Sequence, residues 1–320
     1  MKKIISTILL LAMVVFAAVS CSPAVTPDPD PAPSVEKDYT LGIGVAMDID
    51  GTEVNSTVAA VVTDADGKIV LCRIDAITSE AKLNADGTPA KEALVSKYEL
   101  GDNYNMVAYG GAIAEWYKQA EAFETYVVGK TLNEVKNIAL DENDKPTGTD
   151  LVAGCTIAVS DFIVAIGNAI ESDDKLGFKA SGDIKAAVSV NAELTADANT
   201  LSFSTTFDYA AAVSEAGKVV AALVDSADVT LACTKDADNK LTLSTSVYDG
   251  TKLEQGDDYN MVAYGGAISE WYVQATTFAA TAVGKDAASL DTLPTENIAG
   301  CTIGVDAYKA ALVKAGKSVR

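Results

Sequence analysis

The residues best suited to chemistry lie in a short element that occurs twice, Ala-Gly-Cys-Thr at 153–156 and again at 299–302. In each copy the glycine permits close backbone approach, and we expect the threonine to stand near the start of a helix. Free backbone amides at a helix start bind anions, so the pattern is typical of a phosphate-binding corner. The alternative is a tight loop-to-helix corner packed by small residues, with the threonine as a local cap. The spacing leaves both interpretations open.

The composition excludes several other chemistries. The 320-residue chain has no histidine, which excludes a Ser-His-Asp triad, a Cys-His pair and imidazole-ligated zinc or haem. Its 45 acidic and 24 basic residues give a formal net charge of −21, which repels nucleic acid. We expect no metal site, because the acidic turns at 48–51 and 141–144 are typical of solvated loops and form no EF-hand. No catalytic constellation is present, so we expect a carrier or a binding protein rather than an enzyme.

The first 37 residues are expected to direct and tether the protein. Residues 1–20 combine a cationic start with a short apolar run, which is typical of a secretory signal peptide. The small residues before Cys21 resemble a bacterial lipoprotein box, in which that thiol is acylated. Residues 21–37 hold five of the eight prolines and should form an extended tether. The sequence therefore predicts a cell-envelope protein, lipid-anchored through Cys21 on the extracytoplasmic side of a bacterial membrane.

The rest of the chain is one unit written twice. Residues 101–117 (GDNYNMVAYGGAIAEWY) and 256–272 (GDDYNMVAYGGAISEWY) agree at fifteen of seventeen positions. Upstream, Gly67–Val70 aligns with Gly217–Val220, and we align Leu41-Gly42-Ile43 with Leu176-Gly177-Phe178. This duplication predicts two tandem domains, at 38–173 and 174–320.

Each unit begins with strand patterns and ends with helix patterns. Alternating or β-branched residues predict strands at 39–47, 55–63 and 68–75, the last two joined by an Asp-Ala-Asp-Gly turn. The sequence thus predicts an α+β fold with two tandem similar domains, each a twisted, mainly antiparallel sheet with C-terminal helices.

Three helix signals follow in the first unit. A capping box at Thr131–Glu134 predicts a short helix, and Ser160 is expected to cap the last one. An apolar stripe at helical spacing also follows Gly110-Gly111: Ile113, Trp116, Ala120, Phe123 and Val127. The remaining cysteines are expected to be buried free thiols: Cys72, Cys155, Cys233 and Cys301.

The repeated Ala-Gly-Cys-Thr element resembles the end of the FMN-binding domain of exported, flavinylated electron-transfer proteins. In that family a D-x-x-[S/T]-G-A-T motif receives FMN through a phosphoester to its threonine, installed by a flavin transferase. Asp150, Gly154 and Thr156 match the motif in the first unit, and Gly300 and Thr302 match it in the second. The departures are Ala153 and Ala299 for Ser/Thr, Cys155 and Cys301 for Ala, and Glu296 for Asp. Gly42, Gly44 and the Asp66–Ile69 turn are similar to the family's opening.

The resemblance implies an extracytoplasmic electron carrier with FMN linked to Thr156 and Thr302, in sites that include Gly154, Gly300 and Asp150. It also implies a flavin transferase and a redox partner protein. The alternative is a non-redox surface lipoprotein whose duplicated domains bind a small ligand or a protein partner. The aromatic residues of the repeated segments, such as Trp116 and Trp271, either stack on a planar ligand or pack in the core, and core packing is the favoured interpretation.

Overall fold

The computed structural model describes residues 35–91 and 93–320, and Val35–Arg320 forms one compact unit. The predicted signal peptide and Cys21 lie outside the described residues, as does the tether apart from residues 35–37. Within the described part, no helix combines the length and the apolar character needed to cross a membrane.

The first half of this unit contains three long strands followed by helices. In chain order these elements are β1 (Lys37–Asp50), β2 (Glu53–Asp64), β3 (Ile69–Glu80), α1 (Lys97–Leu100), η1 (Gly101–Tyr104), α2 (Met106–Gly110), α3 (Trp116–Val127), α4 (Leu132–Lys136), α5 (Thr149–Val152) and α6 (Ser160–Glu171).

The second half repeats this order with an extra strand before and after the long ones. Its elements are β4 (Leu176–Ala180), β5 (Ile184–Asp197), β6 (Ser202–Glu215), β7 (Lys218–Lys235), β8 (Leu241–Val247), α7 (Lys252–Gln255), η2 (Gly256–Tyr259), α8 (Met261–Gly265), α9 (Trp271–Ala280), η3 (Ala287–Thr292) and α10 (Asp306–Lys317).

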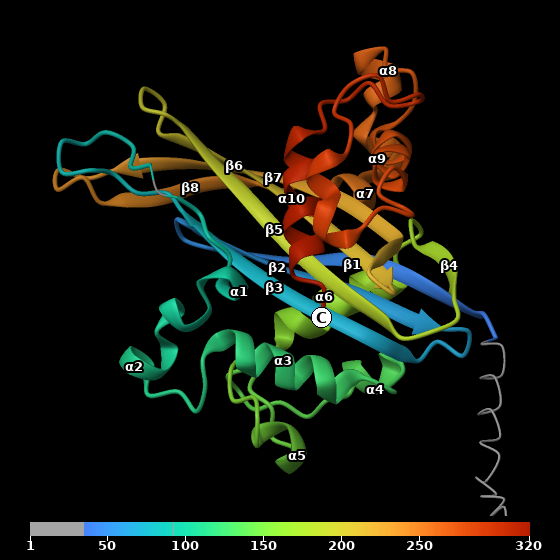
Figure 1. Cartoon of the computed structure of the whole chain (residues 1–320). Helices are drawn as coiled ribbons and strands as arrows, with labels where there is room; N and C mark the ends of the chain where they lie inside the picture. The colour runs from blue at the N-terminus through green and yellow to red at the C-terminus, as the bar shows by residue number, and fades with distance from the viewer. Residues whose placement is uncertain (1–34, 92) are drawn as a thin grey trace, which may run out of the picture. The chain divides into compact units, whose positions relative to one another are not determined.

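The strands form two four-stranded antiparallel sheets, in the orders β3-β2-β1-β4 and β5-β6-β7-β8. Figure 1 shows both sheets with the helices that follow each of them. The fold is therefore α+β with two similar tandem halves, as the sequence predicts.

The strand register identifies which residues are equivalent in the two halves. Val58 on β2 lies opposite both Val45 on β1 and Asp75 on β3. Tyr209 on β6 lies opposite both Val190 on β5 and Asp225 on β7. Strands β1, β2 and β3 thus correspond to β5, β6 and β7.

One alignment expected from the sequence is wrong. Leu176-Gly177-Phe178 lies in β4, which is an added edge strand and is not the counterpart of β1. It pairs with β1 itself, with Leu176 opposite Leu41. Its short apolar pattern resembles that of β1 because both belong to the same sheet, and the counterpart of β1 is β5.

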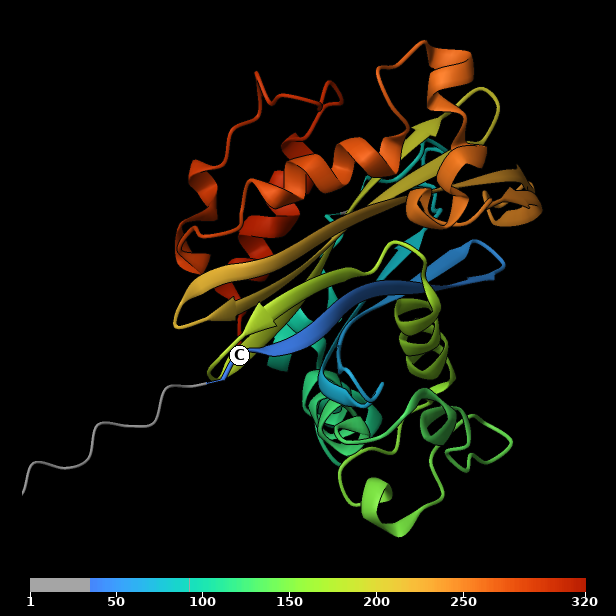
Figure 2. The same cartoon turned by 90° about the vertical axis from the view of Figure 1, so that its right-hand side faces the viewer.

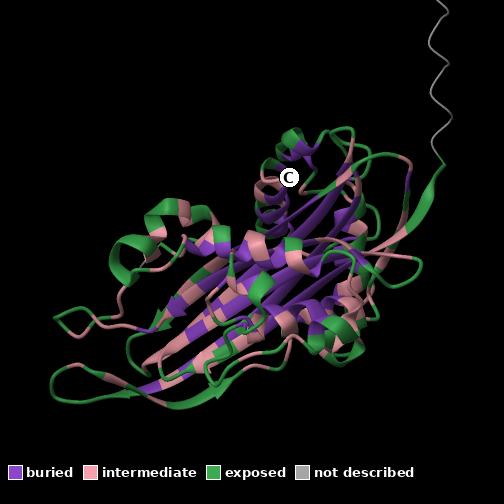
Figure 3. Ribbon diagram, turned by 90° about the horizontal axis from the view of Figure 1, so that it is seen from below, coloured by how far each residue is buried: buried purple, intermediate pink, exposed green. Residues whose placement is uncertain are grey.

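The two sheets pack face to face, and helices cover the outer face of each. One core cluster joins Leu41, Val45 and Val58 of the first sheet to Phe207 and Tyr209 of the second. Polar contacts cross the same interface, where the hydroxyls of Ser56 and Tyr209 are 2.7 Å apart. Figure 2 shows the resulting order of layers, helix–sheet–sheet–helix, and Figure 3 shows the buried residues gathered along the strands.

The outer helix layer of the first half rests on the predicted apolar stripe. Trp116, Ala120, Phe123 and Val127 of α3 are buried against the sheet, which confirms this part of the stripe. The prediction that Ile113 belongs to this stripe is wrong. Ile113 precedes the helix, which begins at Trp116, and it is 57% exposed.

Of the two predicted helix N-terminal caps, one is confirmed and the other is wrong. Thr131 and Glu134 form the predicted capping box of α4. Helix α6 starts at Ser160 itself, and Val159 occupies the N-cap position without a side-chain hydrogen bond, so Ser160 is no cap. The four described cysteines are buried free thiols, as predicted.

Candidate functional site

The predicted attachment threonine of the first half is engaged by a buried glutamine. The backbone N–H of Thr156 and its Oγ1 both donate to Oε1 of Gln119, at 2.8 and 3.1 Å. Gln119 lies on α3 and is fully buried, whereas Thr156 is half-buried and Asp150 on α5 is exposed. A Cβ atom on Gly154 would lie 2.8 Å from Cβ of Ala122, so the glycine permits close packing on α3.

The second half repeats this arrangement. The backbone N–H and Oγ1 of Thr302 donate to Oε1 of the buried Gln274 on α9, at 2.7 and 3.0 Å. Thr302 itself is exposed, and Gly300 adopts a left-handed φ of 83° that favours glycine. The structure thus brings each predicted threonine to a glutamine that the motif does not contain.

Each glutamine also holds the repeated segment in front of its helix. Nε2 of Gln119 donates to the carbonyl oxygen of Ala114, and Nε2 of Gln274 donates to that of Ser269, both at 2.8 Å. Both glutamines follow the repeated Glu-Trp-Tyr by two residues, so their recurrence is the sequence signal that identifies them. The Ala-Gly-Cys-Thr element and the repeated segment are therefore parts of one structure.

A repeated glutamate shapes the same segment. The carboxylate of Glu115 accepts from the backbone N–H groups of Met106 and Val107, at 2.8 and 3.1 Å. Glu270 accepts from Met261 and Val262, at 2.7 and 3.1 Å. These bonds satisfy amides at the start of α2 and α8 that have no partner within the helix.

The segments held in this way expose apolar side chains, and we call residues 105–115 and 260–270 the apolar loops. The exposed fractions in the first loop are 44% for Val107, 89% for Tyr109 and 57% for Ile113. The corresponding values in the second loop are 43% for Val262, 89% for Tyr264 and 62% for Ile268. Figure 1 shows α2 and α8, which carry these loops, on opposite sides of the two sheets.

The expectation that the aromatic residues pack in the core holds for the tryptophans. Trp116 and Trp271 are buried, with edge-to-face contacts to Phe162 and Tyr308. Tyr109 and Tyr264 differ, because almost all of each side chain is in solvent. Core packing therefore explains the repetition of the tryptophans but not that of these two tyrosines.

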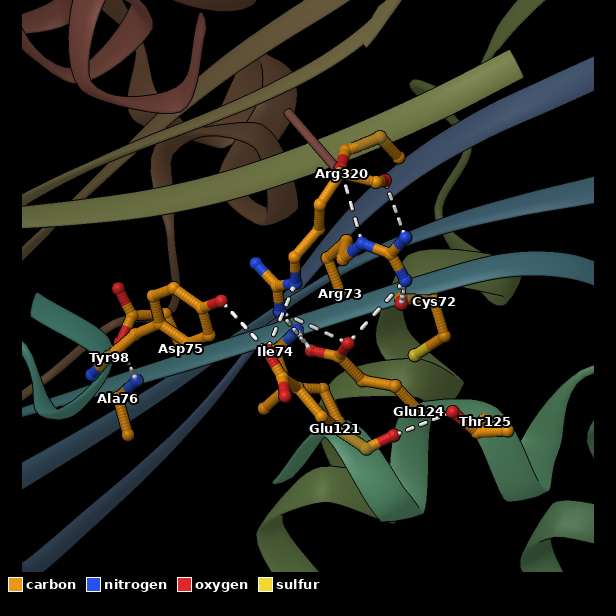
Figure 4. A network of polar contacts seen from close by, with 11 residues as sticks. Cys72, Arg73, Ile74, Asp75, Ala76, Tyr98, Glu121, Glu124, Thr125 and Arg320 are labelled. Atoms are coloured by element: carbon orange, nitrogen blue, oxygen red, sulfur yellow. Dashed lines mark hydrogen bonds and ion pairs between the residues drawn. The ribbon is translucent and has the colours of Figure 1, made fainter. Parts of the chain in front are cut away.

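A charged cluster ties the last residues of the chain to the first half (Figure 4). The buried carboxylate of Glu124 on α3 accepts from Nη2 of Arg320 at 2.9 Å and pairs with Nη1 of Arg73 at 3.4 Å. Burial raises the pKa of Glu124 to about 7, although both arginines lower it. The guanidinium of Arg320 also lies 4.1 Å from the ring centroid of Tyr98. This cluster joins the two halves, and its buried carboxylate is paired with both arginines.

The two predicted attachment hydroxyls already have a hydrogen-bond partner in this structure. Both threonine hydroxyls donate to a buried glutamine, as described above. Cavities of about 490 and 900 Å³ occur among the described residues, but neither is lined by Thr156 or Thr302.

The chain matches no known family model, no curated protein and no solved structure. The assignment of function therefore depends on the chain's own sequence and geometry.

Proposed function

We propose that this is a non-catalytic binding protein of the bacterial cell envelope, anchored through Cys21, which holds a partner protein through its apolar loops. The observation that carries the proposal is the pair Tyr109 and Tyr264, identical in the two halves and each 89% exposed. Exposed side chains experience little packing constraint, so their repetition favours a role at the surface. A buried glutamine donates a hydrogen bond to a carbonyl oxygen near the end of each loop, Gln119 to that of Ala114 and Gln274 to that of Ser269.

The chemistry of the loops indicates the kind of partner. Tyrosine gives a large, rigid contact area with a polar tip, and it is enriched at protein interfaces. Asp102 lies beside the first loop, and Asp257 and Asp258 lie beside the second. Together with the net charge of −21, these acids favour a partner whose contact surface has an apolar centre and a basic rim.

Site-specific photo-crosslinking tests this proposal. A benzoylphenylalanine in place of Tyr109 or Tyr264, in the native host, should capture the same partner from both positions. Val164 on α6 is a control position, because it is 49% exposed and lies outside the loops. Fractionation of the same cells reports whether the protein is in the membrane fraction. Crosslinks that are the same at all three positions would contradict a partner site at the loops, and crosslinks only to a second copy would assign self-association.

Covalent flavin attachment and electron transfer form the second candidate function. It is supported by the motif residues Asp150, Gly154 and Thr156, and by the solvent exposure of Thr302, which a modifying enzyme requires. When bound, FMN would supply the redox chemistry, and the protein would retain it at the envelope.

Flavin fluorescence separates the two candidates. The chain is produced with a flavin transferase, denatured, and run on a gel. Attachment at both sites predicts that fluorescence survives Thr156→Ala and disappears when Thr302→Ala is added. A dark wild-type band with an intact mass that lacks FMN would rule out the flavin assignment.

A further inference from the structure

A lysine of the second half joins its own sheet to the first half. Lys314 on α10 donates from Nζ to the carbonyl oxygen of Val190 at 2.6 Å and to Oδ1 of Asn191 at 3.4 Å. The same ammonium pairs with the carboxylate of Glu99 in the first half. Glu99 belongs to the capping box that begins α1, next to the buried Asp75, which accepts from the N–H of Tyr98.

The position equivalent to Lys314 in the first half is not a lysine. Helices α6 and α10 correspond through the repeated Ala-Gly-Cys-Thr elements that precede them, so Asn168 is the counterpart of Lys314. Asn168 donates from Nδ2 to the Val45 carbonyl at 2.8 Å and to Glu254 at 3.3 Å, which are the same two kinds of partner. Glu254 and Asp225 are the counterparts of Glu99 and Asp75. The acceptors are therefore repeated, but the ammonium is replaced by a shorter, neutral amide.

Two further cations are lost at equivalent positions. Lys317 and Arg320 near the end of α10 correspond to Glu171 and Asp174 near the end of α6. On the first side Arg320 pairs with Glu121 and Glu124. On the other side Glu171 and Asp174 add negative charge, while the counterparts of Glu121 and Glu124 are the uncharged Thr276 and Ala279.

A cavity of about 490 Å³ lies where these cations are missing. Its volume is within the range of small-molecule sites. Six carboxyl groups line it, and none of its lining residues is lysine or arginine; the carboxylates belong to Glu171, Asp173, Asp174, Asp225, Glu254 and Asp257. Of these, Glu171 already pairs with Lys136 at 2.7 Å. The ring of Tyr272 adds one aromatic wall, with its hydroxyl donating to Asp257 at 3.1 Å.

The buried carboxyl group in this cavity lacks the cation that its counterpart has. Burial is the main cause that raises the pKa of Asp225 to about 7, and the nearby Glu254 acts in the same direction. Burial also raises the pKa of Asp75, but only to about 6, with Lys314 among the groups that lower it. Among the described residues, no group of three or more acidic or sulfur ligands is arranged to hold a metal ion. An organic ammonium group therefore fits the cavity better than a metal ion does.

We propose that this cavity is a binding site for an aliphatic di- or polyamine. One ammonium group of the ligand pairs with Glu254 beside the amide of Asn168, which itself donates to the Val45 carbonyl and to Glu254, and so supplies the positive charge that Lys314 supplies in the other half. The remaining ammonium groups pair with the carboxylates at the rim, such as Asp173 and Asp174. The inference is independent of the apolar loops, because none of their residues lines the cavity.

Calorimetric titration of the purified described region, residues 35–320, with spermidine at physiological salt tests the site. We expect one molecule to bind per chain, with n-butylamine binding more weakly because it carries a single charge. Asn168→Lys places the chain's own ammonium in the site and should weaken spermidine binding at least tenfold. Glu254→Gln removes the main charge partner and should weaken it in the same direction.

The matched control is Lys314→Met, which alters the equivalent place on the other side. Spermidine affinity at the cavity should be unchanged, and any binding at the vacated place would appear as a second site in the stoichiometry. Circular dichroism of each variant reports whether the fold is retained. The proposal fails if the wild type does not bind spermidine, or if a folded Asn168→Lys variant binds it as tightly as the wild type. It fails equally if magnesium displaces spermidine at the same concentration of charge, since this would mean diffuse attraction to an acidic surface.

Discussion

At the residue scale, the equivalent positions Gly44 and Ser189 show how closely the helices approach the two sheets. A Cβ atom on Gly44 would lie 2.2 Å from the amide nitrogen of Ala169 and 2.4 Å from the carbonyl oxygen of Ala165, both on α6. The equivalent Ser189 instead donates from Oγ to the carbonyl oxygen of Ala311 on α10, at 2.7 Å. We expect Gly44→Ala to lower the free energy of unfolding by about 3 kcal/mol, because the helix backbone must move, and Ser189→Ala to lower it by about 1 kcal/mol.

Urea denaturation followed by circular dichroism measures both changes. Ser189→Ala is the matched control, since it removes atoms at the same place in the other half. A Gly44→Ala protein as stable as the wild type would mean that α6 does not lie against β1 as described.

The same scale shows how far sequence reasoning reaches at the candidate site. Repetition alone singles out Thr156 and Thr302, and the structure gives both a common hydrogen-bonded role. Repetition also marks Gln119 and Gln274, but it does not show what they do, because a glutamine on an apolar helix face reads as a solvent-facing residue until its partners are known. Those partners are 37 and 28 residues away in the chain, so the contact has no local signal.

At the element scale, local signals succeed where the physics is local. The capping box at Thr131 and the apolar stripe from Trp116 to Val127 are short-range patterns, and both are confirmed. The sequence wrongly aligns β4 with β1, because pairing at a sheet edge depends on a partner strand more than a hundred residues away. In the apolar loops, left-handed Asn105 and Gly111 end short helical turns that helix periodicity does not predict.

At the scale of the whole molecule, the repeat predicts two similar halves but not how they meet. Strand β6 shows how the halves meet, because its residues 207–214 are all buried, with no alternation between buried and exposed positions. Such a strand has both of its faces covered. The second cover is the sheet of the other half, and no pattern within either repeat identifies it.

This burial between layers leads to a prediction about pH. Four carboxyl groups have pKa values raised chiefly by burial: about 6 for Asp75 and Asp208, and about 7 for Glu124 and Asp225. Between about pH 4 and pH 7 the folded state therefore binds more protons than the unfolded state. The free energy of unfolding should then fall as the pH rises through this window and level off above it. Repulsion within a chain of net charge −21 acts in the same direction.

Urea denaturation at pH 5 and pH 8 measures this dependence, and we expect the protein to be more stable at pH 5 by a few kcal/mol. Asp225→Asn should reduce the difference, because its neutral side chain cannot ionise; full ionisation of a carboxyl group shifted this far costs at most about 4 kcal/mol. Spermidine should restore part of the stability at pH 8 if its ammonium lies beside Glu254, since a neighbouring cation stabilises the ionised carboxylate. Higher stability at pH 8 than at pH 5 would mean that these carboxyl groups are already ionised in the folded protein.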